Sequence, residues 1–96
     1  MKTSEIIKRV VDIFEDFPEI HSAILFGSVA KGIEYPGSDL DIAIVGKFDY
    51  FALDERIKNE IDTLRTIEIV EYDDVVNERF KEEIDRYGKV IYAKAG

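Results

Sequence analysis

The sequence predicts a small α/β domain of the α+β type, with helices packed on a mixed sheet of about four strands. Apolar residues recur at helical spacing in three segments, and short runs of branched aliphatic residues lie between them. The two kinds of segment alternate along the chain. With 96 residues, of which 46% are hydrophobic, the chain can build one modest core. We therefore expect a single domain over residues 1–96.

Three amphipathic helices follow from apolar residues spaced three and four positions apart. In the first helix Ser4 is the expected N-cap and Pro18 closes the segment, while Gly88 stops the third. The apolar positions of the three helices are, in chain order, Ile6, Ile7, Val10, Val11 and Phe14; Leu53, Ile57, Ile61 and Leu64; and Val76, Phe80, Ile84 and Tyr87.

Four strands are expected between and after these helices, over residues 22–26, 39–45, 66–71 and 90–92. A short helical turn over residues 29–32 should follow Gly27-Ser28 directly, and Pro36-Gly37 signals a tight turn before the second strand. The predicted order is helix, strand, short helix, strand, helix, strand, helix, strand.

The composition excludes several classes of protein. A formal net charge of −8 argues against nucleic acid as the main partner, because such proteins neutralise many phosphates with basic side chains. The absence of cysteine excludes disulfides and thiolate metal sites. No apolar run approaches the roughly 18 to 20 residues of a membrane span, and the start of the chain lacks the apolar segment of a signal peptide. We expect a cytoplasmic protein.

A Gly-Ser pair, Gly27-Ser28, stands where the first strand runs into the short helical turn. Glycine lets a backbone approach phosphate closely, and the free N–H groups of such a turn, with the Ser28 hydroxyl, can bind its oxygens. An ordinary strand-to-helix turn is the alternative interpretation of this pair taken alone.

Acidic residues mark the next two strands. Asp39 and Asp41 are two positions apart, so both side chains should leave one face of a strand, while Leu40 and Ile42 point into the core. Two such carboxylates repel unless a cation lies between them, and Mg²⁺ is the expected partner. The alternative is an exposed acidic strand start, since the whole chain is acidic.

Glu68 supplies a third carboxylate if its strand lies beside residues 39–45. Three carboxylates can bind two metal ions and activate an attacking hydroxyl. The alternative is a solvent-facing glutamate on an edge strand. Glu71, Asp73 and Asp74, which follow closely, are expected to be loop or capping acids.

Together these motifs resemble the signature of the DNA polymerase β-like nucleotidyltransferase superfamily, and most closely its minimal nucleotidyltransferases, the MNT proteins. The resemblance covers most of the chain and rests on three segments: Gly27-Ser28-Val29-Ala30-Lys31-Gly32 with Ser38-Asp39-Leu40-Asp41, Ile67-Glu68-Ile69-Val70, and Gly88-Lys89-Val90-Ile91-Tyr92. It implies a nucleotidyltransferase-like fold and the transfer of AMP from ATP to an acceptor hydroxyl, with pyrophosphate leaving.

The resemblance also implies a role for each matching residue. Gly27 and Ser28 would hold the triphosphate, with Lys31 and Ser38 as further nucleotide contacts. The metal ligands and catalytic acids would be Asp39, Asp41 and Glu68. Two residues depart from the family pattern. Lys31 stands where the family often has Arg, and it either contacts phosphate or lies on the surface; Glu68 replaces the more usual Asp.

Minimal members of this family commonly pair with a separate helical HEPN protein, and some act as antitoxins that adenylylate a tyrosine of that toxin. Larger members of the family carry an extra helical domain that binds the acceptor, and residues 1–96 are too few to include a separate acceptor-binding domain. The resemblance therefore implies a HEPN-type partner here. Candidate docking residues are Tyr35, Tyr50 and Phe51, with core packing as the alternative. Two hypotheses remain: a Mg²⁺-dependent adenylyltransferase that modifies its partner, and a subunit that binds nucleotide or neutralises the partner without turnover.

Overall fold

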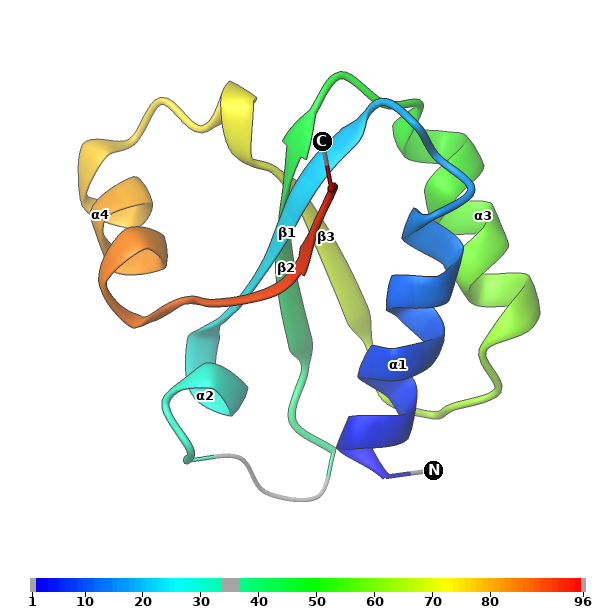
Figure 1. Cartoon of the computed structure of the whole chain (residues 1–96). Coiled ribbons are helices and arrows are strands. Elements are labelled where there is room, and N and C mark those ends of the chain that lie inside the picture. The colour runs from blue at the N-terminus through cyan, green and yellow to red at the C-terminus, as the bar shows by residue number, and fades with distance from the viewer. Residues whose placement is uncertain (1, 34–36, 96) are drawn as a thin grey trace.

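The computed structural model describes residues 2–33 and 37–95, and its helices and strands alternate along the chain (Figure 1). The helices are α1 (Thr3–Phe14), α2 (Gly27–Ala30), α3 (Tyr50–Glu60) and α4 (Glu78–Tyr87), with a 3₁₀ turn, η1, at Tyr72–Asp74. The strands are β1 (Ile20–Phe26), β2 (Leu40–Gly46), β3 (Ile67–Glu71) and β4 (Lys89–Ala93). The predicted α+β class and element order are confirmed.

The strands form one mixed sheet in the order β3-β2-β1-β4. The central strand β1 is antiparallel to both β2 and β4, whereas β2 and β3 are parallel. In this register Asp41 lies opposite Phe26 on one side and opposite Glu68 on the other. The end of β1 and the two acidic strands therefore meet at one place in the sheet.

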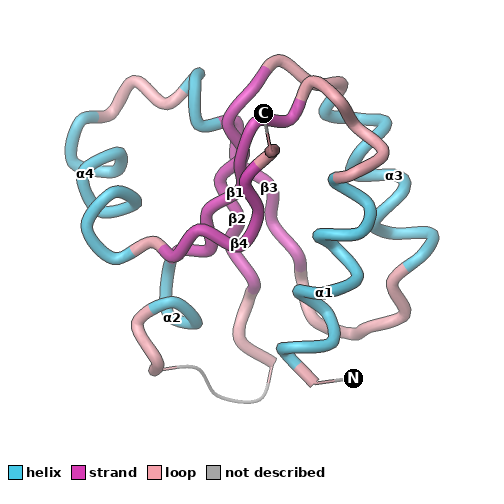
Figure 2. The backbone as a smooth tube through the Cα atoms, in the orientation of Figure 1, coloured by secondary structure: helices cyan, strands magenta, loops and turns pink. Residues whose placement is uncertain are grey.

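Helices cover both faces of the sheet: α1 and α3 lie on one side, and α4 with the short α2 on the other (Figures 1 and 2). The larger core cluster lies under α1 and α3 and includes Phe14, Ile44 and Leu53. A smaller cluster under α4 is built on Phe26 and Ile84.

Side-chain alternation along β2 decides which face carries the acids. Leu40, Ile42 and Ile44 are all buried in the larger core cluster. The side chain of Asp41 therefore projects from the opposite face, the one that α2 and α4 border. Because β3 is parallel and in register, Glu68 projects from the same face as Asp41.

Three helix assignments from the sequence were wrong at the helix ends. Ser4 lies inside α1 and Lys2 occupies the N-cap position. Leu64 lies beyond α3, because the chain turns to an extended conformation at Ile61. Val76 precedes α4, whose N-cap is Asn77, with its side chain accepting a hydrogen bond from the N–H of Phe80. Leu64 and Val76 are almost fully exposed, so their spacing does not reflect packing.

Strand boundaries also differ slightly from expectation. β1 begins at Ile20, and β2 begins at Leu40, so Asp39 lies just before the strand and not on it. Of the predicted Pro36-Gly37 turn, Pro36 lies outside the described residues, as does the candidate docking residue Tyr35. Among the described residues, no helix is both long and apolar enough to cross a membrane.

Candidate active site

The sequence-predicted site residues converge on the α4 side of the sheet. Gly27 directly follows the last residue of β1 and opens α2, while Asp41 lies opposite that last residue, Phe26, on β2. Glu68 is the register partner of Asp41 on β3. The strand-to-helix turn and two of the three predicted carboxylates are thus brought together by the sheet ladder alone.

Gly27 and Asp41 are in close contact. A Cβ placed on Gly27 would lie 2.4 Å from the Oδ2 atom of Asp41, a distance at which something must move. Gly27 also has a φ of 78°, in the region that favours glycine. The glycine is therefore required both by its backbone conformation and by the approach of the carboxylate. This contact places the predicted phosphate turn against the predicted metal ligand.

The ionised form of the Asp41 carboxyl group is disfavoured by its surroundings. Its burial, a hydrogen bond with Glu68, and the negative charges of Glu68 and Asp39 together raise its pKa from 3.8 to about 6. Both neighbours are exposed acids, whereas Asp41 itself is half-buried. A cation placed among these three groups would relieve the repulsion that the proton otherwise relieves.

The donor set fits Mg²⁺ in its chemistry. Among the residues that the structure describes, no three His, Cys, Asp or Glu side chains are close enough to form a complete metal cluster. Asp41 and Glu68 nevertheless share a hydrogen bond, and Asp39 is near enough to raise the pKa of Asp41. Mg²⁺ commonly uses one or two carboxylates and takes its other ligands from water and substrate phosphates. The pair Asp41 and Glu68 therefore suits Mg²⁺ in its chemistry, while binding by all three of Asp39, Asp41 and Glu68 stays a prediction.

Ser38 belongs to the framework of the site. It is only 7% exposed, and its carbonyl oxygen accepts a hydrogen bond of 2.9 Å from Nε of Arg65. Direct contact of Ser38 with nucleotide stays a prediction. Sequence reasoning missed Arg65, because a single arginine in a loop between a helix and a strand carries no recognisable pattern.

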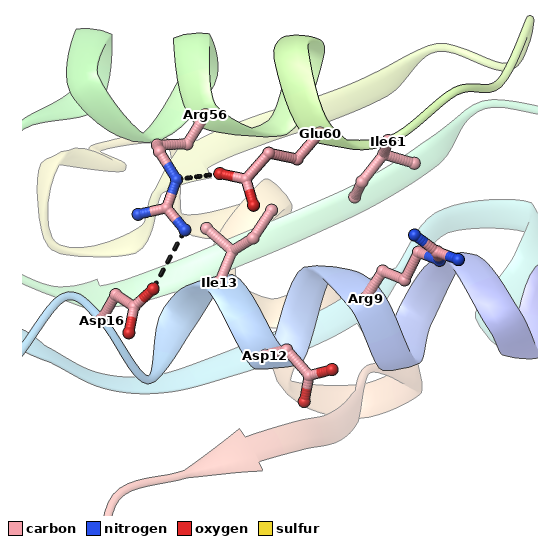
Figure 3. A pocket seen from close by; sticks show the side chains of 7 residues that line it. All are labelled: Arg9, Asp12, Ile13, Asp16, Arg56, Glu60 and Ile61. Atoms are coloured by element: carbon pink, nitrogen blue, oxygen red, sulfur yellow. Dashed lines mark hydrogen bonds and ion pairs between the residues drawn. The ribbon is translucent and has the colours of Figure 1, made fainter.

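A separate pocket of about 200 Å³ lies between α1 and α3, on the other side of the sheet (Figure 3). Arg56 of α3 forms ion pairs there with Asp16, which lies just after α1, and with Glu60 of α3 itself. Figure 3 shows the Arg56 side chain directed to both acids, so its charge is already matched. None of the residues that line this pocket was predicted to bind nucleotide or metal. The Arg56–Asp16 ion pair joins α3 to the segment just after α1.

Comparison with known families agrees with the geometry. The sequence model of the family described as polymerase beta, nucleotidyltransferase matches residues 8–95, nearly the whole chain. The chain belongs to this family. A search of curated proteins finds no significant match.

Solved structures show the same fold as this nucleotidyltransferase domain. A toxin–antitoxin structure with AMP-PNP has a TM-score of 0.71 and 18% identity, over 97% of this chain and 75% of that one. A MntA–HepT toxin–antitoxin structure has a TM-score of 0.69 and 17% identity, over 96% and 74%. A structure of a tri-AMPylated HEPN toxin from Shewanella oneidensis in complex with an MNT antitoxin has a TM-score of 0.70 and 16% identity, over 97% of this chain and 74% of that one.

In this nucleotidyltransferase, Lys31 is held by α4. Its Nζ lies 2.5 Å from Oε1 of Glu83 and 4.8 Å from the centre of the Tyr87 ring. The hydrogen bond with Glu83 raises the pKa of Lys31, so the side chain stays charged. To bind a phosphate, Lys31 must first break its ion pair with Glu83.

If Lys31 contacts phosphate, as the family resemblance implies, the Glu83→Gln substitution is expected to lower the KM for the nucleotide by about 2- to 5-fold, because the exposed ion pair no longer competes for Lys31. Steady-state kinetics would measure this, with Glu82→Gln, an exposed neighbour on the same helix, as the control. An unchanged KM in both Glu83→Gln and Lys31→Ala would show that Lys31 does not contact phosphate.

The Asp41→Asn substitution is expected to stabilise the metal-free domain at pH 7.5. Folding raises the pKa of Asp41, so the folded state is penalised at pH values above about 6, and this penalty disappears as the pH falls toward 3.8. After allowance for screening by water, the gain is about 1 kcal/mol, or roughly 4 to 8 °C in Tm. Thermal unfolding at pH 7.5 and pH 4.5 measures it. A variant less stable than wild type at pH 7.5 would contradict the account.

Proposed function

We propose that this domain is a Mg²⁺-dependent adenylyltransferase that transfers AMP from ATP to a hydroxyl of a partner protein. The observation that carries the proposal is the contact of Gly27 with Asp41 and of Asp41 with Glu68 on one face of the sheet. Membership of the nucleotidyltransferase family supports the reaction class. The acceptor and the choice of ATP belong to the proposal alone.

Each residue has a distinct task in this proposal. The Gly27-Ser28 turn holds the triphosphate with its backbone N–H groups and the Ser28 hydroxyl. Asp39 and Asp41 would hold Mg²⁺, which would offset the negative charge of the phosphates. Glu68 lies beside Asp41 and assists the attacking hydroxyl.

The proposed reaction needs no reactant other than ATP and the acceptor hydroxyl. The acceptor hydroxyl oxygen forms a bond to the α-phosphorus of ATP, and the bond from that phosphorus to pyrophosphate breaks. The hydroxyl proton passes to the carboxylate of Glu68.

The proposed partner is a HEPN-type protein, so the domain would be the antitoxin of a HEPN/MNT toxin–antitoxin pair. Solved structures of the same fold hold an MNT antitoxin with a HEPN toxin. Phe51 at the start of α3 is 80% exposed, as a docking residue requires, whereas Tyr50 is partly buried against the core. Tyr50 therefore matches the core-packing interpretation better.

A second candidate function is a non-catalytic subunit that binds nucleotide or neutralises its partner by contact. It is favoured by Glu68 in place of the more usual Asp, and by the incomplete metal cluster among the described side chains. Binding without turnover needs the Gly27-Ser28 turn but not all three acids.

Labelled ATP separates the two functions. The domain and its HEPN partner are incubated with Mg²⁺ and ATP that carries the label on either the α- or the γ-phosphate. The adenylyltransferase proposal expects the partner to retain α-label and no γ-label. If the domain binds the partner but neither protein becomes labelled from α-labelled ATP, the non-catalytic subunit is favoured. If the partner retains the γ-label, the domain is a phosphotransferase.

A further inference from the structure

A single arginine, Arg65, connects three segments next to the acidic site. Its Nε donates a 2.9 Å hydrogen bond to the carbonyl oxygen of Ser38, and its Nη1 donates to Oγ1 of Thr3 at the start of α1. Its own backbone N–H donates to Oγ1 of Thr63. Figure 1 shows the start of α1 and the segments that lead into β2 and β3 coming together at this end of the domain.

These bonds hold the backbone on both sides of Asp39. On one side, the carbonyl of Ser38 is bound by the Arg65 side chain. On the other side, the N–H of Leu40 donates a 2.9 Å hydrogen bond to the carbonyl of Thr66. Asp39 itself lies outside the strand, so the sheet ladder does not fix it. Its position depends on these two anchors.

Both anchors come from consecutive residues, Arg65 and Thr66, that lead directly into β3. Glu68 follows on that strand and is the register partner of Asp41. The segment 65–68 thus carries one acid of the site and fixes the backbone around another. A guanidinium suits this task better than an ammonium, because its planar fork can donate to two acceptors at fixed angles.

We propose that Arg65 is a positioning residue, which holds the Ser38–Asp39 backbone so that Asp39 stays in place to bind the metal with Asp41 and Glu68. The inference rests on the proposed function for its metal ion. Groups that orient metal ligands without touching the metal typically affect metal affinity by about 10- to 100-fold.

Arg65→Met tests the inference, with Arg56→Met as a matched control. Arg56 is also an arginine that bridges two segments, but it joins α3 to Asp16, just after α1, on the opposite side of the sheet. Mn²⁺ serves as the probe, and its binding is measured from the electron paramagnetic resonance signal of free Mn²⁺ in the presence of a non-hydrolysable ATP analogue. Circular dichroism and Tm confirm that each variant is folded.

We expect Arg65→Met to weaken Mn²⁺ binding by about 10-fold or more and Arg56→Met to change it by less than about 2-fold. In AMP transfer, Arg65→Met should lower kcat and raise the Mg²⁺ requirement while the KM for ATP stays within about 2-fold. Should Arg65→Met fail to fold, Arg65→Lys replaces it, with an expected loss of about 3-fold, because one ammonium cannot reproduce the fork.

Unchanged Mn²⁺ affinity in a folded Arg65 variant would overturn the inference, as would an equal loss in the Arg56 control. The binding measurement does not depend on turnover. If the wild-type domain binds Mn²⁺ with nucleotide but transfers no AMP, the proposed reaction fails while the role of Arg65 is still decided by the Mn²⁺ affinities.

Discussion

Replacing Asp39 and Asp41 together with alanine is expected to lower AMP transfer by at least about 1,000-fold, or about 4 kcal/mol of transition-state stabilisation. The two carboxylates are proposed to keep the metal ion against the phosphates, and the double variant leaves only Glu68 of the three proposed ligands. Transfer of α-label from ATP to the partner protein measures the effect. Binding of the partner itself should persist.

The control for this double variant removes the same charge elsewhere. Asp12 on α1 and Asp62 after α3 are both exposed and lie outside the proposed site. Asp12→Ala/Asp62→Ala should keep transfer within about 2-fold of wild type, since exposed charges at a distance are largely screened. Equal transfer by the Asp39/Asp41 variant and wild type would contradict the catalytic assignment.

Gly27→Ala is expected to lower transfer by about 100-fold, because a shift of about 1 Å in a catalytic group has effects of that size. The added Cβ would lie 2.4 Å from Oδ2 of Asp41, so the carboxylate must move. The substitution also forces alanine into a left-handed conformation, which costs about 1 to 2 kcal/mol of stability. Both transfer and unfolding are measured.

Gly32→Ala separates backbone strain from displacement of the acid. Gly32 has a φ of 75°, close to the 78° of Gly27, but a Cβ there would meet no described atom within 4 Å. Both variants should therefore lose stability through backbone strain, whereas only Gly27→Ala should lose transfer. Similar transfer by both variants would show that the contact between Gly27 and Asp41 does not matter for the reaction.

Most of the site could be predicted from the sequence because it depends on local rules. The turn at Gly27 follows from a strand that runs directly into a helix, and the orientation of Asp41 follows from alternation with the buried Leu40 and Ile42. The proximity of Glu68 needed one further assumption, that its strand lies beside β2, and the parallel ladder confirms it.

The remaining features depend on contacts between distant parts of the chain. Arg65 meets Ser38 and Thr3 only after the sheet and α1 have assembled, and spacing in the sequence does not reveal such a contact. The same holds for Lys31, which forms an ion pair with Glu83 of α4. Helix ends were misplaced for a different reason: Leu64 and Val76 continue the apolar spacing by chance beyond the residues that end or cap the helices.

The central claim is that Gly27-Ser28 and the acids on β2 and β3 form one site for nucleotide and metal. Paramagnetic broadening tests it most directly: Mn²⁺ and a non-hydrolysable ATP analogue are added to the isotope-labelled domain, and backbone amide signals are followed by nuclear magnetic resonance. The account predicts that the signals of Gly27, Ser28, Asp41 and Glu68 broaden first. Broadening centred instead on the pocket between α1 and α3, where Ile13 and Ile61 lie, would contradict it.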